Sequence, residues 1–192
     1  MTKEKNIEIE LRSRFSKEKY DELLSFFERN AKHLGDDDKE IWFYILEDKL
    51  LKVTHNISKE NSKITLKLNR IGFGSSFEEI EFYIDEKDTE KAVRMFNILG
   101  HDDLHEPQVL RKNFEYKGVE FALKYSQSWG YHLELEIVVQ SKEEQQEAEN
   151  KLREVAKELD ITIMTDEELF SFTQALEKDY DERVRKSKQS RY

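Results

Sequence analysis

The sequence predicts an α+β fold in which eight antiparallel strands form a barrel-like tunnel and helices pack outside it. Three observations lead to this fold class. About eight segments alternate apolar and polar residues, several of them are joined by short polar connectors, and four other segments carry apolar residues at helical spacing. With 192 residues, the chain is long enough for one domain with a substantial core.

The first predicted strand, residues 6–15, carries the pattern that is most informative about function. Side chains alternate across the two faces of a strand, so Glu8, Glu10 and Arg12 share one face, while isoleucine and leucine residues form the other. Two carboxylates and a guanidinium are costly to bury together. They suit the wall of a wet cavity that binds a metal and an anion.

Four segments are predicted as helices because their apolar residues recur every three to four positions. Ser16 is a suitable N-cap for the first of them. The third and fourth open with the capping boxes Ser141-x-x-Glu144 and Thr165-x-x-Glu168. The expected helices span 16–30, 89–99, 141–159 and a segment that starts at 165.

The remaining regular segments alternate as strands do. The connectors Glu47-Asp48-Lys49 and Tyr116-Lys117-Gly118 are short and polar, which is typical of hairpins. We expect a single domain over 1–180 and a basic, flexible tail over 181–192. The other expected strands span 41–48, 50–57, 62–71, 77–85, 107–116, 119–126 and 131–140.

The composition excludes several classes of function. The net charge of −10 argues against a nucleic-acid-binding role. The chain has no cysteine, so any metal must take oxygen or nitrogen ligands. No run is long and apolar enough for a membrane span, and the N-terminus shows no signal-peptide core. We therefore expect a cytoplasmic protein without a membrane or nucleic-acid partner.

The charges on the polar faces of the strands are sorted by sign. Three strands carry Glu-x-Glu, three other strands carry a cation, and the first strand adds a cation to its Glu-x-Glu pair. A sheet with one ordinary solvated face is the alternative, but it predicts a random mixture of charges. If the apolar faces pack under the helices, the polar faces line a charged tunnel. The residues concerned are the pairs Glu8/Glu10, Glu79/Glu81 and Glu134/Glu136, and the cations Arg12, Lys52, Lys67 and Arg111.

Such a lining suits a polyphosphate with a divalent metal. Converging carboxylates hold hard cations such as Mg²⁺ or Mn²⁺, and converging lysines and arginines bind phosphate oxygens. A polyphosphate needs both, because the metal bridges its oxygens while the cations neutralise the remaining charge. The chain has no Walker A loop, so the phosphates would be held by side chains.

The order of these motifs resembles the CYTH domain, also called the triphosphate tunnel metalloenzyme family. Glu8-x-Glu10-x-Arg12 matches the N-terminal Glu-x-Glu-x-Lys signature with Arg in place of Lys. Ile64-Thr65-Leu66-Lys67 is similar to the Leu-Thr-x-Lys strand, and the segment from Glu78 to Glu81 is similar to the class IV adenylate cyclase branch. The closing Glu-x-Glu strand matches Glu134 and Glu136.

The resemblance implies an enzyme that binds a triphosphate with Mg²⁺ or Mn²⁺. The catalytic carboxylates are expected among Glu8, Glu10 and Glu136, without a choice of which one acts as base. The implied metal-side carboxylates are Glu8, Glu10, Glu79, Glu81, Glu134 and Glu136. The implied phosphate-binding residues are Arg12, Lys52, Lys67, Arg70, Arg111 and Lys124.

The chain departs from the family pattern at four positions. Thr54, Phe77 and Asn113 stand where basic residues are usual, and Lys124 stands where an Asp is usual. Lys124 could restore some of the lost positive charge. His132 lies on the polar face beside Glu134, so a ligand or proton-carrier role is open for it as well.

These observations leave three hypotheses. The first is a metal-dependent triphosphatase or class IV-like adenylate cyclase that transfers a phosphoryl or nucleotidyl group. The second is a degenerate module that binds a polyphosphate or nucleotide without turnover. The third is a solvated sheet on which the charges pair with one another and nothing binds. A monomer and a homodimer are both compatible with the sequence.

Overall fold

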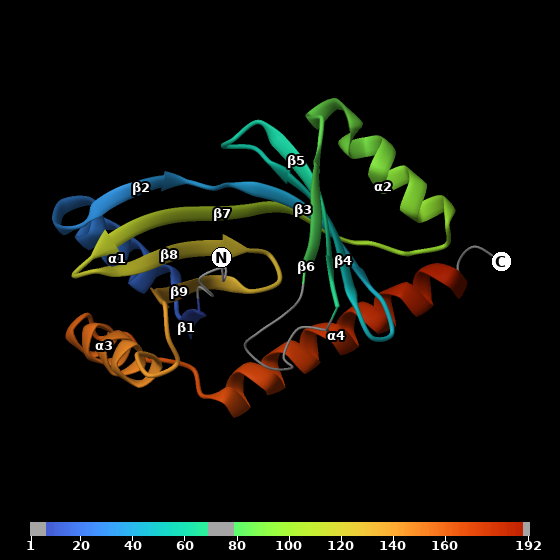
Figure 1. Cartoon of the computed structure of the whole chain (residues 1–192). Helices are drawn as coiled ribbons and strands as arrows, with labels where there is room; N and C mark the ends of the chain where they lie inside the picture. The colour runs from blue at the N-terminus through green and yellow to red at the C-terminus, as the bar shows by residue number, and fades with distance from the viewer. Residues whose placement is uncertain (1–6, 69–78, 190–192) are drawn as a thin grey trace. The chain divides into compact units, whose positions relative to one another are not determined.

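The chain is described by a computed structural model over residues 7–68 and 79–189 (Figure 1). It divides into two compact units, Met1–Asp37 with Leu110–Met164 (unit 1) and Asp38–Val109 with Thr165–Tyr192 (unit 2). The strands are β1 (Ile7–Arg14), β2 (Lys32–Asp36), β3 (Lys39–Ile45), β4 (Leu50–Asn56), β5 (Asn61–Lys67), β6 (Glu79–Ile84), β7 (Leu104–Tyr116), β8 (Val119–Ser126) and β9 (Gly130–Val139). The helices are α1 (Lys17–Asn30), a short 3₁₀ turn (Glu86–Asp88), α2 (Thr89–Ile98), α3 (Gln145–Glu158) and α4 (Asp166–Gln189).

Unit 1 has its core between one sheet face and the helices α1 and α3. Residues Tyr20, Leu23 and Phe27 recur along α1 at helical spacing and are buried. The ring of Phe27 lies 4.8 Å from that of Phe121 on β8, and Leu152 of α3 belongs to the same cluster. Burial of these aromatic and aliphatic side chains holds the strands β1, β9 and β8 flat against the helices, so their other face is left for polar side chains.

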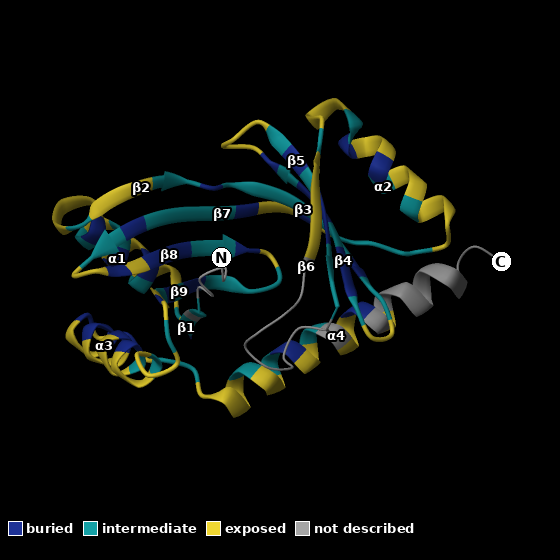
Figure 2. Cartoon of the chain, in the orientation of Figure 1, coloured by how far each residue is buried: buried dark blue, intermediate teal, exposed yellow. Residues whose placement is uncertain are grey.

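Unit 2 has a separate core between α2 and the strands β3, β4 and β5. Its buried centre contains Tyr44, Val53, Ile64 and Ala92. Figure 2 shows the buried and exposed residues along α2, as expected for a helix that packs one face on a sheet. Because side chains alternate along β4, burying Val53 turns Lys52 and Thr54 to the opposite face.

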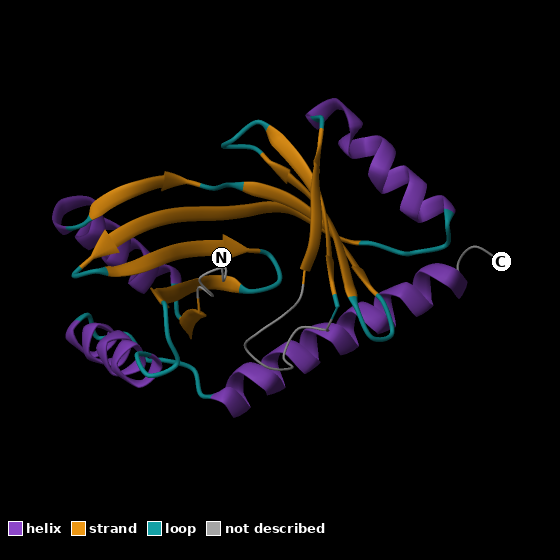
Figure 3. Cartoon of the chain, viewed as in Figure 1, coloured by secondary structure: helices purple, strands orange, loops and turns teal. Residues whose placement is uncertain are grey.

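The α+β class with an antiparallel sheet is confirmed, with one strand more than expected (Figure 3). The order is β1-β9-β8-β7-β3-β4-β5-β6, and β2 pairs with β7. In the described part of the chain this order is open, with β1 and β6 at its ends. The prediction missed β2 because its sequence, KHLGD, does not alternate and contains Gly35, where the register shifts.

Of the two predicted capping boxes, the one at α4 marks the start of its helix and the one at α3 does not. Thr165 and Glu168 form the reciprocal capping box at the start of α4, with distances of 2.8 and 3.2 Å. Glu144 accepts from Ser141 N, but α3 begins only at Gln145, so the predicted start at 141 was wrong. Helix α4 continues to Gln189, past the expected start of the tail. No helix in residues 7–68 and 79–189 combines the length and apolarity that crossing a bilayer requires.

Candidate functional site

Three glutamates form a row across neighbouring strands of unit 1. Glu10 of β1 lies opposite Glu136 of β9, and Glu136 lies opposite Glu120 of β8. Residues directly opposite on antiparallel strands point to the same face, and like charges in such pairs repel. A cation bound beside this acidic row would therefore be stabilised.

Two residues further along the strands, the face becomes cationic around a single carboxylate. Glu134 of β9 lies opposite Arg12 of β1. Its Oε2 accepts from Lys124 Nζ at 2.8 Å and lies 3.7 Å from Arg111 Nη1, while its Oε1 lies 3.5 Å from Arg12 Nε. Arg12 also reaches back to the acidic row, where its Nε lies 2.6 Å from Glu10 Oε1. We call Arg12, Arg111 and Lys124 the cationic cluster.

The electrostatic balance at Glu134 favours its charged form. Burial would raise the pKa of Glu134, but the positive charges of Lys124, Arg12 and Arg111 outweigh it and lower the pKa to about 2. Glu134 is therefore a carboxylate throughout the physiological pH range. It neutralises one charge of the cluster and leaves the face around it positive.

His132 is held neutral beside the cluster. Its Nδ1 donates to the carbonyl oxygen of Gly130 at 2.9 Å, because a carbonyl can only accept. Burial, followed by the charge of Lys124, lowers the pKa of His132 to about 4. A neutral imidazole adds no charge here, so His132 does not bind phosphate as a cation at neutral pH.

Unit 2 carries a second set of the predicted residues on one face of its sheet. Lys52 lies opposite Thr65, which lies opposite Glu81. Glu81 pairs with Lys63 at 2.7 Å. Thr65 is fully buried, and within the described residues its Oγ1 has no hydrogen-bond partner. Buried hydroxyls normally have a partner, so this face has hydrogen-bonding capacity for a ligand or water.

The structure thus brings together part of the predicted site. A chain of ion pairs connects Glu10, Arg12, Glu134, Arg111 and Lys124, all in unit 1. In the strand register, Glu136 lies opposite Glu10 and Glu8 lies opposite Val138. Lys52, Lys67, Glu79 and Glu81 lie in unit 2, where Lys67 is opposite Glu79. Arg70, Phe77 and Glu78 fall outside the described residues.

Two residues acquire roles that the sequence did not reveal. Asn113 accepts from Arg111 Nε at 2.7 Å, and it donates to the carbonyl oxygen of Gly35 at 3.1 Å. It therefore fixes the guanidinium of Arg111 instead of supplying a charge of its own. Glu120 completes the acidic row. Its place on the polar face of the 119–126 strand was the signal that could have identified it.

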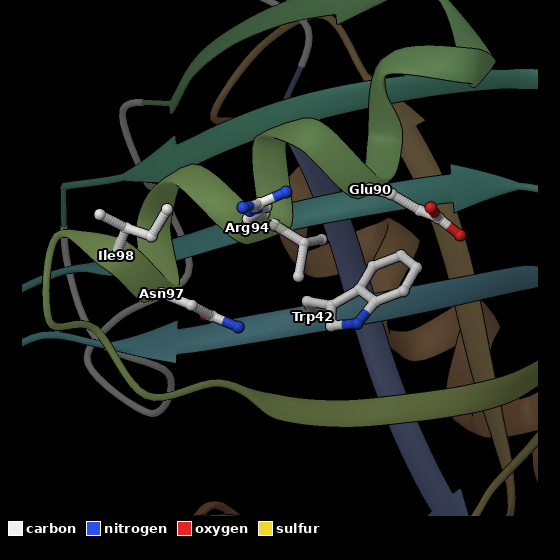
Figure 4. Close-up of a pocket in the computed structure, with 6 residues that line it drawn as sticks. Trp42, Glu90, Arg94, Asn97 and Ile98 are labelled. Carbon is white, nitrogen blue, oxygen red and sulfur yellow. The ribbon is translucent and has the colours of Figure 1, made fainter.

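A groove in unit 2 is lined by none of the residues predicted for the site. It has a volume of about 460 Å³ and is lined by Trp42, Glu90, Val93, Arg94, Asn97 and Ile98. Figure 4 shows the α2 residues of this set around the indole of Trp42 on β3. Trp42 lies opposite Val53 and Lys52 lies opposite Phe43, so the groove is on the other face of this sheet from Lys52.

A family model describes the arrangement of motifs along the chain. The CYTH domain model matches residues 6–168, a range that includes the strands β1 to β9 and the helices α1, α2 and α3 of the described part of the chain. The chain belongs to the CYTH domain family. CYTH proteins form a metal-dependent family that binds triphosphate substrates. A search of curated proteins finds no match.

Solved structures share the CYTH fold with this chain at low sequence identity. A conserved hypothetical protein from Pyrococcus furiosus is 24% identical, with a TM-score of 0.62 over 82% of this chain and 94% of that one. An adenylate cyclase candidate from Vibrio parahaemolyticus is 14% identical, with a TM-score of 0.57 over 86% and 98%. An adenylyl cyclase candidate from Hippeastrum, described as having a dominant triphosphatase activity, is 16% identical, with a TM-score of 0.60 over 87% and 95%.

The metal that the CYTH family implies can be tested against the residues present. The described residues contain no cluster of three or more His, Asp or Glu that could hold a metal ion. Mg²⁺, however, usually keeps several waters and takes only one or two carboxylates together with substrate phosphates. Glu10 and Glu136, opposite each other in the acidic row, fit that mode of binding through oxygen donors. This CYTH chain can therefore accept a metal that arrives with its substrate.

Proposed function

We propose that this CYTH protein is an enzyme that binds a triphosphate-containing small molecule with Mg²⁺ or Mn²⁺ and catalyses phosphoryl or nucleotidyl transfer. The observation that carries the proposal is the cationic cluster next to the acidic row on one face of unit 1. Two arginines and a lysine converge around Glu134, within 2.8 to 3.7 Å of its carboxylate. Planar guanidiniums and a lysine in this arrangement suit phosphate oxygens.

The roles divide between the two parts of this face. Arg12, Arg111 and Lys124 bind and orient the phosphates, and they stabilise the negative charge that develops during transfer. Glu10 and Glu136 hold the metal, which polarises a phosphate oxygen when bound. For Lys52 and Lys67, on the sheet of unit 2, and for Arg70 we keep the proposal of a phosphate-binding role, and for Glu8, Glu79 and Glu81 the proposal of an acidic, metal-side role.

The descriptions of the neighbouring structures point to the same chemistry. One is a candidate adenylate cyclase and another is described as having a dominant triphosphatase activity. Hydrolysis needs a water nucleophile, and cyclisation needs the ribose 3′-hydroxyl. Both reactions use the same grip on the phosphates, which is why a single site can support either one.

Binding without turnover is the second candidate function. It is favoured by Thr54 and Asn113, which stand at positions where the resemblance leads us to expect basic residues. Thr54 is buried, and Asn113 is engaged with Arg111 and Gly35. Fewer cations weaken the stabilisation of charge during transfer more than they weaken binding itself.

Chromatographic product analysis separates these functions. The protein is incubated with ATP, inorganic triphosphate or thiamine triphosphate, each with Mg²⁺, with Mn²⁺ or with EDTA. Cyclic AMP and pyrophosphate identify a cyclase, and released phosphate identifies a triphosphatase. Tight binding without product from any substrate supports the binding module. The absence of both binding and product would contradict the proposed function.

A further inference from the structure

Both oxygens of the Glu134 carboxylate face cations. Lys124 Nζ and Arg111 Nη1 lie 2.8 and 3.7 Å from Oε2, and Arg12 Nε lies 3.5 Å from Oε1. The side chains of Glu134 and Lys124 are mostly buried, at 14% and 15% exposure. A carboxylate in this setting has little capacity left for another positive ion.

The neighbouring glutamates have different surroundings. Arg12 Nε lies 2.6 Å from Glu10 Oε1, and another glutamate, Glu136, lies opposite Glu10. A divalent ion next to Glu134 would approach three positive charges, which is electrostatically unfavourable at low dielectric. The same ion between Glu10 and Glu136 would relieve the repulsion of two negative charges.

The cationic cluster itself requires a counter-charge. Arg12 comes from β1, Arg111 from β7 and Lys124 from β8, so no local sequence feature holds the three side chains together. Their like charges repel, and the Glu134 carboxylate lies within 4 Å of all three. A shorter side chain at position 134 would no longer contact all three cations and would let them move apart.

We infer that Glu134 is a positioning residue that gathers Arg12, Arg111 and Lys124 into one phosphate-binding group, and that it does not bind the metal ion. The inference rests on the proposed function, because it assigns a role within the same site. Glu134 touches the cations and not the substrate, so it acts through them. The metal is then left to Glu10 and Glu136.

The test compares Glu134→Asp with the matched control Glu136→Asp. Both variants keep the negative charge and shorten a side chain by one methylene, and the two residues lie on the same face of β9, two positions apart. Calorimetry measures the dissociation constant of inorganic tripolyphosphate in EDTA and in Mn²⁺. The ratio of the dissociation constant in EDTA to that in Mn²⁺ reports how much the metal contributes to binding.

In Glu134→Asp we expect affinity in EDTA to fall about tenfold, which corresponds to the loss of one charge-assisted contact. The ratio should stay within about twofold of the wild-type ratio, because a twofold change corresponds to less free energy than one weak contact contributes. Glu136→Asp should do the reverse, with a ratio that falls by about tenfold or more and an unchanged affinity in EDTA. If Glu134→Asp lowers the ratio as Glu136→Asp does, or leaves affinity unchanged in both buffers, the inference is wrong.

A second measurement does not depend on substrate binding. The Nε–H signal of Arg12, which donates to Glu134 Oε1 at 3.5 Å, should exchange slowly with water in ¹⁵N NMR spectra of the wild type and faster in Glu134→Asp. If tripolyphosphate does not bind the wild type in either buffer, the proposed function fails, and the NMR result alone decides whether Glu134 positions the cations. Unchanged exchange rates would contradict the positioning role of Glu134. If Glu134→Asp does not fold, Lys124→Gln removes the shortest contact from the other side and should also weaken binding in EDTA while keeping the ratio.

Discussion

Lys124 Nζ lies 2.8 Å from Glu134 Oε2, and neither side chain is more than 15% exposed. The two residues come from adjacent strands, β8 and β9, but are not directly opposite each other, because Lys124 faces His132 and Glu134 faces Ala122. The contact is therefore diagonal. It connects the charge of Lys124 to a carboxylate that already has two arginines nearby.

Replacement of Lys124 by Met should destabilise the fold by about 2 kcal/mol. Breaking a buried ion pair typically costs about 3–5 kcal/mol, but here Arg12 and Arg111 remain near Glu134. The control is Lys112→Met, which removes an ion pair to Asp36 at 3.1 Å with both side chains more than 30% exposed, and should cost about 0.5 kcal/mol. Urea unfolding measures both. Equal, small effects would show that the Lys124 pair contributes no more than a surface pair.

The stability of the protein should fall in acid because of His132. Its pKa is lowered from 6.5 to about 4, so the folded state disfavours the protonated form. The contribution is complete above pH 6.5 and is lost as the pH falls toward 4. It amounts to about 3 kcal/mol at most. The pKa of Glu134 is lowered from 4.5 to about 2, so its contribution is complete above pH 4.5 and is lost as the pH falls toward 2, which overlaps the window of His132 only between pH 4.5 and 4.

The variant His132→Asn should remove most of this dependence, because Asn can still donate to Gly130 but does not titrate. The control His33→Asn, at a position where the side chain is 52% exposed, should retain the slope of the wild type. The free energy of unfolding is measured by urea at a series of pH values from 7 to 4. A slope that survives in His132→Asn would assign the effect to other groups.

Replacement of Asn113 by Ala should weaken tripolyphosphate binding although Asn113 carries no charge. It removes the acceptor at 2.7 Å from Arg111 Nε and frees the guanidinium to move. The expected loss of affinity is about threefold to tenfold, the size of one charge-assisted hydrogen bond. Calorimetric titration checks it. Unchanged affinity would mean that the site does not use the orientation of Arg111.

Replacement of Glu10 by Gln should abolish metal-dependent turnover, with a loss of about 100-fold or more, because it removes one of the two carboxylates that we assign to the metal. The fold should remain intact by circular dichroism. Glu120→Gln, an exposed member of the acidic row, should keep most of the activity. Full activity of Glu10→Gln would contradict the assignment of Glu10 as a metal-binding carboxylate.

The sequence was sufficient to predict which residues share a face of unit 1. Alternation along 6–15 and 131–140 places Glu10, Arg12 and Glu134 together, and the observed register sets Arg12 opposite Glu134. The contact of Glu134 with Lys124 could not be predicted in this way. It depends on the register between β8 and β9, which the turn from Ser126 to Gly130 fixes with a positive φ at Gly130.

Two features of the fold escaped prediction for local reasons. The strand β2 is short and has no apolar alternation, so it forms only because β7 offers it a partner. The start of α3 was placed too early because Glu144 accepts from Ser141 N without a helical turn between them. In both cases a tertiary contact or a local turn overrides the pattern in the sequence.

The most direct measurement is a calorimetric titration of the wild-type protein with inorganic tripolyphosphate in Mg²⁺. We predict binding at one site per chain in the micromolar range, and a loss of affinity of about 100-fold or more in the double variant Arg12→Met/Lys124→Met, which lacks two of the three clustered cations. The absence of binding by the wild type, or equal affinity in the double variant, would contradict the assignment of the cationic cluster as the triphosphate site.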